Sequence, residues 1–465
     1  MIGKMPKEAA QLRKNIKGID QKVLTSSRQK HKYIYLDNAA STPMLNSVWS
    51  ELEEFMSWYS GVHRGTGYKS IISSKVYDEC HAMIAHFAGA DSLLDTVVMV
   101  KNTTEAINKL SYRLGFKPGD IVISTNMEHH SNDLPWRAKT AVKYISVDEK
   151  GNLCSHELRQ ILKQYYPRVK LVAVCGASNV TGHVNDVHEL AKIAHEYHCP
   201  ILVDGAQLIP HLPFSMLSHQ NPGHIDFLAF SGHKVFSPLG TGVLIGPKSL
   251  FYKGEPEYAG GGTVNMVFDH KIYWADLPDK EEAGSANVTG TFALAKTLTY
   301  LQKLDMRKLA QYEENLTAYA LKNITQLDGI TLYGDKKRVG VISFNIEGMP
   351  HALVGAILCF EAGIGVRTGC FCAQKYVRHL LNLEENAAIV DSLAKPDYPG
   401  MVRISLAAYN TREEIDHLVE WINRIRGHAD EYKKNYHYSS QYGCYYPSKR
   451  DDRDINQLLN KFLAV

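Results

Sequence analysis

The chain of 465 residues is too long for one small core, and with 45% hydrophobic and 22% charged residues it has the composition of a soluble globular protein of about two domains. Its formal net charge of +3 is close to neutral for this size, which argues against a nucleic-acid-binding protein. No stretch approaches the roughly 20 apolar residues that span a bilayer, and the start lacks the apolar core of a secretion signal. The eight irregularly spaced cysteines are typical of reduced thiols. We therefore expect a cytoplasmic protein that does not bind membranes.

The first part of the chain predicts an α/β domain. Residues 1–30 are expected to form a helical extension and residues 31–300 a large domain. From about residue 95 to 245, β-branched runs alternate with helical patterns, which predicts a mostly parallel sheet with helices on both faces. The elements expected there and just before are a helix at Ser70–Phe87, strands at Thr96–Val100, Ile121–Ser124, Leu171–Val174, Ile201–Val203 and Phe227–Phe230, and a helix at Val187–Tyr197.

The second part predicts a smaller α+β domain over residues 301–427 and a tail over 428–465. Helical stretches are expected at 291–303, 305–327, 351–361 and 411–426, with strand-like runs at Val339–Phe344, Ile364–Arg367 and Val402–Leu406. The segment Glu384–Gly400 contains two prolines and is expected to be a loop.

Polar residues follow the predicted strands, where ligands sit in folds of this class. Thr103 and Thr104 open a helix, so they either cap it or bind a phosphate there. His129 follows the next strand, either as a satisfied polar group or lying flat on a planar ring. Asp204 ends a buried apolar strand, where it is either a helix cap or the partner of a cation such as a protonated pyridine nitrogen. Gln207 could then turn back to a phenolic oxygen on the same ring.

A lysine has few structural explanations at the end of an apolar strand, and Lys234 stands there in Ser231-Gly232-His233-Lys234. A buried amine has a depressed pKa and condenses readily with an aldehyde. Ser231 and His233 alternate with Lys234 and can face a phosphate. Taken together, these residues predict a site for pyridoxal 5'-phosphate (PLP), held covalently by Lys234.

The order of these motifs resembles the class V branch of fold-type I PLP enzymes, and within it the group II cysteine desulfurases and selenocysteine lyases. The resemblance covers roughly residues 33–427 and includes Glu282-Ala283-Gly284-Ser285. It implies a seven-stranded, mostly parallel sheet and a homodimer. It also implies that Ser285 reaches the phosphate across the dimer interface, and that His63 and Arg64 lie near the partner's site and contact substrate.

The run Arg367-Thr368-Gly369-Cys370-Phe371-Cys372-Ala373 indicates the reaction. In the resemblance Cys372 takes the place of the nucleophile, and a thiolate there can attack the sulfur of bound cysteine and keep it as a persulfide. Arg367 nearby could favour the thiolate, and we also expect it among the substrate-binding residues. The Gly-Cys-Phe-Cys form looks like the loop of molybdenum cofactor sulfurases, and it leaves Cys370 as a candidate second thiol. Because a zinc site generally wants four ligands, we expect no metal.

Arg403, inside the apolar run Val402–Leu406, falls where the family binds the substrate carboxylate. Asn179 falls where the family assists both that carboxylate and the cofactor ring. We therefore expect a PLP-dependent cysteine desulfurase that converts L-cysteine to L-alanine and passes sulfur to an acceptor protein, with Lys234, Cys372 and His129 as catalytic residues. The alternatives are a selenocysteine lyase or another C–S lyase and, outside catalysis, a PLP-binding module.

Overall fold

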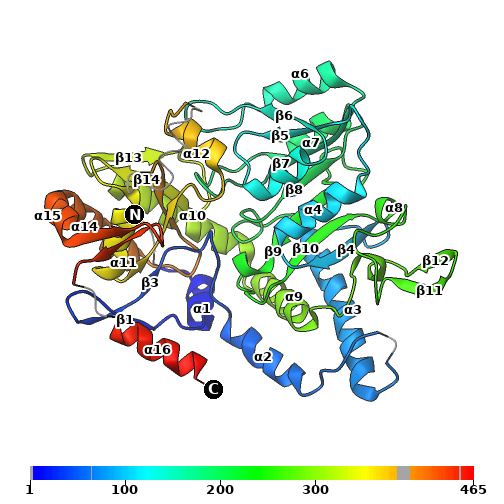
Figure 1. The fold of residues 1–465 in the computed structure, drawn as a ribbon, viewed down its shortest axis with the longest axis horizontal. Helices are drawn as coiled ribbons and strands as arrows, with labels where there is room; N and C mark the ends of the chain where they lie inside the picture. The colour runs from blue at the N-terminus through cyan, green and yellow to red at the C-terminus, as the bar shows by residue number, and fades with distance from the viewer. Residues whose placement is uncertain (1–3, 64, 385–397, 450–451, 465) are drawn as a thin grey trace.

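The computed structural model describes residues 4–63, 65–384, 398–449 and 452–464. A larger unit built on a seven-stranded sheet lies to the right in Figure 1, and a smaller one lies to the left. The loop expected over Glu384–Gly400 falls largely, at residues 385–397, outside the described residues. Within the described ranges, no helix is both apolar and long enough to cross a membrane.

The central sheet has the strand order β4-β10-β9-β8-β7-β5-β6. Neighbouring strands are parallel except at β10, which pairs antiparallel with both β4 and β9. The inner strands are buried on both faces, as parallel strands covered by helices must be. The mostly parallel α/β sheet is therefore confirmed. Its strands are β4 (Asp95–Val100), β5 (Ile121–Thr125), β6 (Ala141–Ile145), β7 (Val169–Cys175), β8 (Ile201–Asp204), β9 (Phe227–Ser231) and β10 (Gly242–Pro247).

Helices between these strands cover the sheet, and two of them, α4 and α7, begin at a side-chain cap. Asn102 accepts the N–H of Glu105 at the start of α4, and Asp186 accepts the N–H of Glu189 at the start of α7. Short turns of 3-10 helix follow β5 and β9. The helices of this unit are α2 (Asn46–Met56), α3 (Tyr68–Ala88), α4 (Thr103–Arg113), α5 (Leu134–Arg137), α6 (His156–Tyr165), α7 (Val187–His195), α8 (Lys248–Phe251) and α9 (Val288–Lys303), with η1 (His130–Asn132), η2 (Gly232–Lys234) and η3 (Asp279–Glu281).

The smaller unit has an antiparallel sheet in the order β13-β14-β17-β16. The run Ile364–Arg367, expected as one strand, is divided because the chain changes partners at Val366. Its first half pairs in parallel with β3 (Ile34–Tyr35), and its second half joins β17. The elements are β13 (Ile330–Tyr333), β14 (Val341–Ile346), β15 (Ile364–Gly365), β16 (Arg367–Gly369), β17 (Met401–Ser405), α10 (Met306–Ile324), α11 (His351–Phe360), α12 (Gln374–Leu380) and α14 (Arg412–Gly427).

The two ends of the chain and one hairpin complete the fold. The tail packs on the smaller unit, where the hydroxyl of Tyr436 donates to Glu361 Oε1 at 2.9 Å. The predicted domain boundaries after residues 30, 300 and 427 stay predictions. The remaining elements are α1 (Lys7–Asn15), β1 (Lys22–Leu24), β2 (Lys30–Lys32), the exposed hairpin β11 (Val264–Phe268) and β12 (Lys271–Trp274), and the tail elements α15 (Ala429–Asn435), β18 (Tyr436–Ser439), β19 (Cys444–Pro447) and α16 (Arg453–Leu463).

Candidate active site

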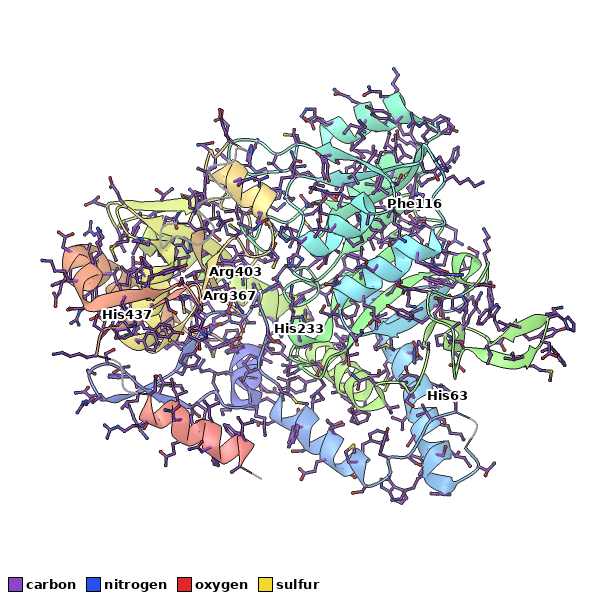
Figure 2. The ribbon with its side chains drawn as sticks, viewed as in Figure 1. His63, Phe116, His233, Arg367, Arg403 and His437 are labelled. Carbon is purple, nitrogen blue, oxygen red and sulfur yellow. The ribbon has the colours of Figure 1, made fainter. Side chains whose placement is uncertain are left out.

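A cavity of about 350 Å³ lies where the carboxyl ends of the large sheet face the smaller unit. Figure 2 shows Arg403 and Arg367 together near the centre of the molecule, with His233 close by. The cavity brings together twelve of the residues predicted from sequence, namely Thr103, Thr104, His129, Asn179, Asp204, Gln207, Ser231, His233, Lys234, Arg367, Cys372 and Arg403.

The start of α4 forms a hydroxyl-rich corner of this cavity. Asn102 is the cap of the helix, so Thr103 and Thr104 are not needed for capping. The Thr103 N–H donates to Ser231 Oγ at 2.8 Å, and the two hydroxyls lie 2.7 Å apart. Thr104 Oγ1 lies 2.7 Å from Ser131 Oγ. Hydroxyls and free N–H groups at the positive end of a helix are suited to bind an anion.

Asp204 and Gln207 form the floor of the cavity at the end of β8. Asp204 is 4% exposed and accepts the N–H of Ala206 at 3.0 Å. Burial raises the pKa of this carboxyl, although that hydrogen bond and the charge of Lys234 lower it. Gln207 Nε2 donates to the Ala39 carbonyl at 2.7 Å, while its Oε1 is buried without a hydrogen-bond partner among the described residues.

His129 lies in the wall of the cavity as a neutral ring. Burial, together with the charges of Lys234, His130 and Arg403, lowers its pKa to about 3. The Ser131 N–H donates to His129 Nδ1 at 3.1 Å. Because Nδ1 accepts a hydrogen bond, the proton of the neutral ring lies on Nε2.

Lys234 ends the short η2 turn after β9. Burial lowers the pKa of its amine and Arg403 adds to this, whereas Asp204 and Cys372 raise it. A larger fraction of the amine is therefore uncharged at neutral pH than for an exposed lysine. His233, the preceding residue, also has a pKa lowered by burial, to about 4.

A buried cation, Arg403 on β17, lines the same cavity as Lys234. Arg403 is 3% exposed, its guanidinium lies 4.7 Å from the centre of the Phe371 ring, and its Nε is buried without a partner among the described residues. It donates to the Asn179 carbonyl at 2.9 Å and to Asp37 Oδ1 at 3.1 Å. The second oxygen of Asp37 pairs with Arg367 at 3.0 Å, so one carboxylate holds both guanidinium groups.

The thiols of the Cys370–Cys372 loop have different surroundings. Cys372 is exposed and lines the cavity. Cys370 Sγ lies 3.4 Å from the Pro399 carbonyl, and burial raises the pKa of its thiol. Phe371 and Cys372 have φ angles of 52° and 55°, a left-handed conformation that costs roughly 1–2 kcal/mol per residue.

Two acidic residues of the site region carry no spacing signal in the sequence. Asp37 is one of them. The other is Glu128, which lies beside the cavity and accepts from Thr125 Oγ1 at 2.6 Å, the Cys175 N–H at 2.9 Å and Asn132 Nδ2 at 2.7 Å. Burial raises the pKa of Glu128 to about 8, partly offset by those hydrogen bonds.

Three predicted residues among those the structure describes do not line the cavity of the single chain. His63 lies apart from it in Figure 2, with its Nδ1 at 3.8 Å from Asp279 Oδ2. Ser285 lines a second hollow with Lys101 and Thr241. Cys370 points away, as described above, and Arg64 lies outside the described residues.

The sequence matches the aminotransferase class V family over residues 34–418, so the chain belongs to that family. Its relatives include a cysteine desulfurase of Pectobacterium atrosepticum, 36% identical over 87% of this chain and 96% of the relative. A probable cysteine desulfurase of Halalkalibacterium halodurans is 33% identical over 84% of this chain and 93% of that protein.

Solved structures of cysteine desulfurases share the fold. One from Thermococcus onnurineus has a TM-score of 0.78 at 30% identity, covering 92% of this chain and all of that one. One from Escherichia coli has a TM-score of 0.75 at 27% identity, covering 90% and 98%. The resemblance to class V enzymes and cysteine desulfurases is therefore confirmed, while the likeness of the Gly-Cys-Phe-Cys loop to molybdenum cofactor sulfurases stays a prediction.

Proposed function

We propose that this protein is a PLP-dependent cysteine desulfurase that converts L-cysteine to L-alanine and leaves the sulfur as a persulfide on Cys372. One observation carries the proposal: a single cavity holds Lys234, Asp204 and His129 together with an exposed thiol and the buried guanidinium of Arg403. The relatives at 33% and 36% identity are themselves named cysteine desulfurases.

The residues of the cavity fit PLP. The hydroxyls at the start of α4, with Ser231 and His233, would hold the phosphate. Asp204, whose buried carboxylate accepts the Ala206 N–H, would hold the ring nitrogen. The side-chain oxygen of Gln207 has no hydrogen-bond partner among the described residues, so it is a polar group that a ligand could satisfy. Bound through the amine of Lys234, PLP supplies an electron sink for bonds at the substrate α-carbon.

Arg403 would orient the substrate by its carboxylate. Its fork geometry matches a carboxylate, and Asp37 and the Asn179 carbonyl already fix the plane of the guanidinium. Asn179 is held in turn, because its Nδ2 donates to the Phe371 carbonyl at 2.7 Å. The substrate site and the thiol loop are thereby positioned by the same residues.

Lys234 is better suited than His129 to take the α-proton. The amine has a lowered pKa and is therefore more often free to accept a proton. His129 already accepts at Nδ1 and carries its proton on Nε2. We assign His129 to contact with the ring and to hydrogen-bond donation from its Nε2–H, and Lys234 to proton removal.

The Cys372 thiolate would attack the sulfur of bound cysteine. An S–S bond forms as the Cβ–S bond of the substrate breaks, and the carbon gains a proton, so that L-cysteine and a thiol give L-alanine and a persulfide. Because Cys372 is exposed, the persulfide could meet an acceptor protein or small thiol. We also propose a homodimer and a reducing cytoplasm, in agreement with the eight free thiols.

Replacement of Cys372 by serine tests this function. We expect the variant to keep PLP, seen by its visible absorbance, and to lose persulfide formation and alanine release from L-cysteine. Cys370→Ser is the matched control, because Cys370 faces Pro399, and we expect it to keep persulfide formation. Undiminished alanine release by the Cys372→Ser variant would overturn the role of Cys372. If the unmodified protein binds PLP but releases no alanine, the assignment of L-cysteine as its substrate is wrong.

A further inference from the structure

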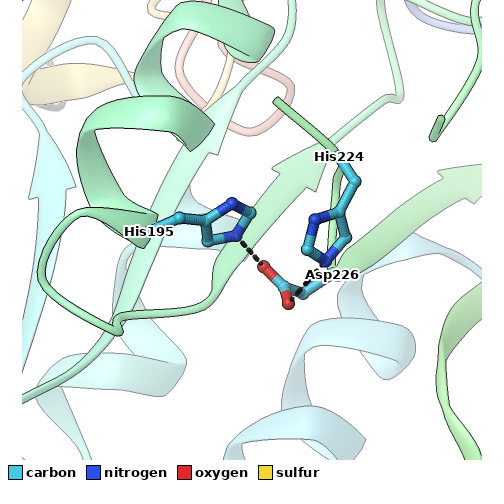
Figure 3. Close-up of side chains that lie close together, drawn as sticks. All are labelled: His195, His224 and Asp226. Atoms are coloured by element: carbon cyan, nitrogen blue, oxygen red, sulfur yellow. Dashed lines mark hydrogen bonds and ion pairs between the residues drawn. The ribbon is translucent and has the colours of Figure 1, made fainter. Parts of the chain in front are cut away.

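Three side chains converge at the opposite end of the large sheet from the cavity (Figure 3). His195 lies in the last turn of α7, and His224 and Asp226 immediately precede β9. His195 Nε2 lies 2.9 Å from Asp226 Oδ2, and His224 Nε2 lies 3.2 Å from Asp226 Oδ1. The Ile201 N–H at the start of β8 also donates to Asp226, at 2.8 Å, which fixes the carboxylate.

Both rings are oriented by backbone carbonyls. His195 Nδ1 lies 2.7 Å from the Pro222 carbonyl, and His224 Nδ1 lies 3.2 Å from the Asn221 carbonyl. A carbonyl oxygen can only accept, so each Nδ1 carries a proton. In a neutral ring, Nε2 then presents its lone pair to Asp226. The same arrangement, with Nδ1 held by a carbonyl, orients histidine ligands in metal sites.

Both rings present Nε2 to the same carboxylate, one to each of its oxygens. The rings are stacked with centroids 4.4 Å apart and planes 26° apart, so the two Nε2 atoms lie on the same side of the group. A single divalent cation between them would satisfy both Nε2 atoms and the carboxylate.

The spacing also suits a metal ion. Zinc binds nitrogen and oxygen at about 2.0–2.2 Å, which places tetrahedral ligand atoms roughly 3.3–3.5 Å apart. Here the potential ligand atoms all lie within 4.8 Å of one another, so small rotations of the side chains would bring them to that spacing around an ion. The side chains of His195, His224 and Asp226 are 20%, 13% and 18% exposed, so an ion can enter and water can complete its shell.

We propose that His195, His224 and Asp226 form a binding site for a divalent transition-metal ion of the zinc class. The site is separate from the cavity and joins α7 to the segment before β9, so its role is to fix that segment. The His219 ring lies 4.9 Å from the His224 ring, tilted by 31°, but it is paired with Asp95 at 3.0 Å, which leaves three protein ligands among the described residues. The expectation of no metal rested on cysteine spacing, and the histidines that meet here come from separate segments.

Metal content of the PLP-loaded protein tests the site. Protein stripped with a chelator is equilibrated with Zn²⁺, and the bound zinc is counted for the unmodified chain and for Asp226→Asn, His224→Gln and His188→Gln. His188 is the matched control, because its Nδ1 lies 2.7 Å from the Gly223 carbonyl on the same segment but it is not a ligand. We expect both ligand variants to lose one zinc per chain and His188→Gln to lose none.

Equal zinc content in the unmodified protein and both ligand variants would overturn the site. If those variants do not fold, the visible absorption spectrum of Co²⁺ bound to the unmodified protein is the deciding measurement. Ligand-field bands without the thiolate charge-transfer band are expected from two imidazoles and a carboxylate, and their absence would overturn the proposal.

Discussion

Asp37 shows how one side chain can organise the residues around a cavity. Its two oxygens pair with Arg403 and Arg367, which are 3% and 52% exposed, so one guanidinium is fixed inside the protein and the other lies at the surface. A buried cation needs such a partner, because an unpaired charge in the interior is costly. Asp37 is a positioning residue in the proposed function, acting on substrate through Arg403.

A second consequence at this scale concerns acid stability. Burial lowers the pKa of His129 from its ordinary 6.5 to about 3, so between these values the unfolded chain binds a proton here more readily than the folded one. The contribution of the neutral His129 ring to the free energy of unfolding is complete above pH 6.5, and it is lost as the pH falls toward 3. We expect His129→Gln to flatten the decline of the free energy of unfolding over this range in urea titrations.

The same change at exposed His437 is the control for this measurement, and it should leave the decline unchanged. Identical pH slopes in the unmodified protein and His129→Gln would contradict a buried neutral ring.

At the scale of elements, the ends of β5 and β7 are joined by one side chain. Glu128 accepts from a residue of each strand and from Asn132, with no other buried acceptor replacing it in the described contacts. Leaving a buried donor unpaired costs about 1–3 kcal/mol. We expect Glu128→Ala to lower the free energy of unfolding by about 3 kcal/mol and to weaken PLP binding, as followed by denaturant titration and cofactor absorbance.

Glu128→Gln is the conservative control. Its amide oxygen can still accept from Thr125 and Cys175, so the loss should be clearly smaller. A change within about 0.5 kcal/mol for Glu128→Ala, the range of ordinary surface substitutions, would contradict this linkage.

The sequence predicted correctly those features that depend on residues close together in the chain. Apolar runs followed by Asp204 or Lys234 placed both residues correctly at strand ends, because parallel strands bring their carboxyl ends to one edge. Asp37 could not be assigned in this way, since its partner Arg403 lies 366 positions away. The division of Ile364–Arg367 was missed because strand pairing, rather than residue preference, decides where the chain changes sheets.

On the scale of the whole molecule, the position of Ser285 tests the proposed dimer. Ser285 lies outside the cavity of its own chain, so in the dimer it would complete the partner's phosphate site. We expect Lys234→Ala and Ser285→Asp to be inactive as separate homodimers, because one lacks the amine and the other repels the phosphate. Mixed dimers should regain activity, since one of their two cavities has both native residues.

Refolding the two variants together and measuring alanine release checks this expectation. Two copies of the same variant refolded together serve as the control. Mixed dimers that are as inactive as their parents would contradict a shared site.

The loop that carries Cys372 is tied to the large unit by its own carbonyls. Asn179 donates to the Phe371 carbonyl and the His130 N–H donates to the Cys372 carbonyl at 2.7 Å. Movement of the smaller unit away from the sheet would break both bonds and open the left-handed turn. In the proposed desulfurase, the sulfur is therefore not carried outward by a swinging arm. The acceptor has to bring its own nucleophile to a sulfur atom that stays in place. The size of the opening above Cys372 therefore decides which acceptors can receive the sulfur.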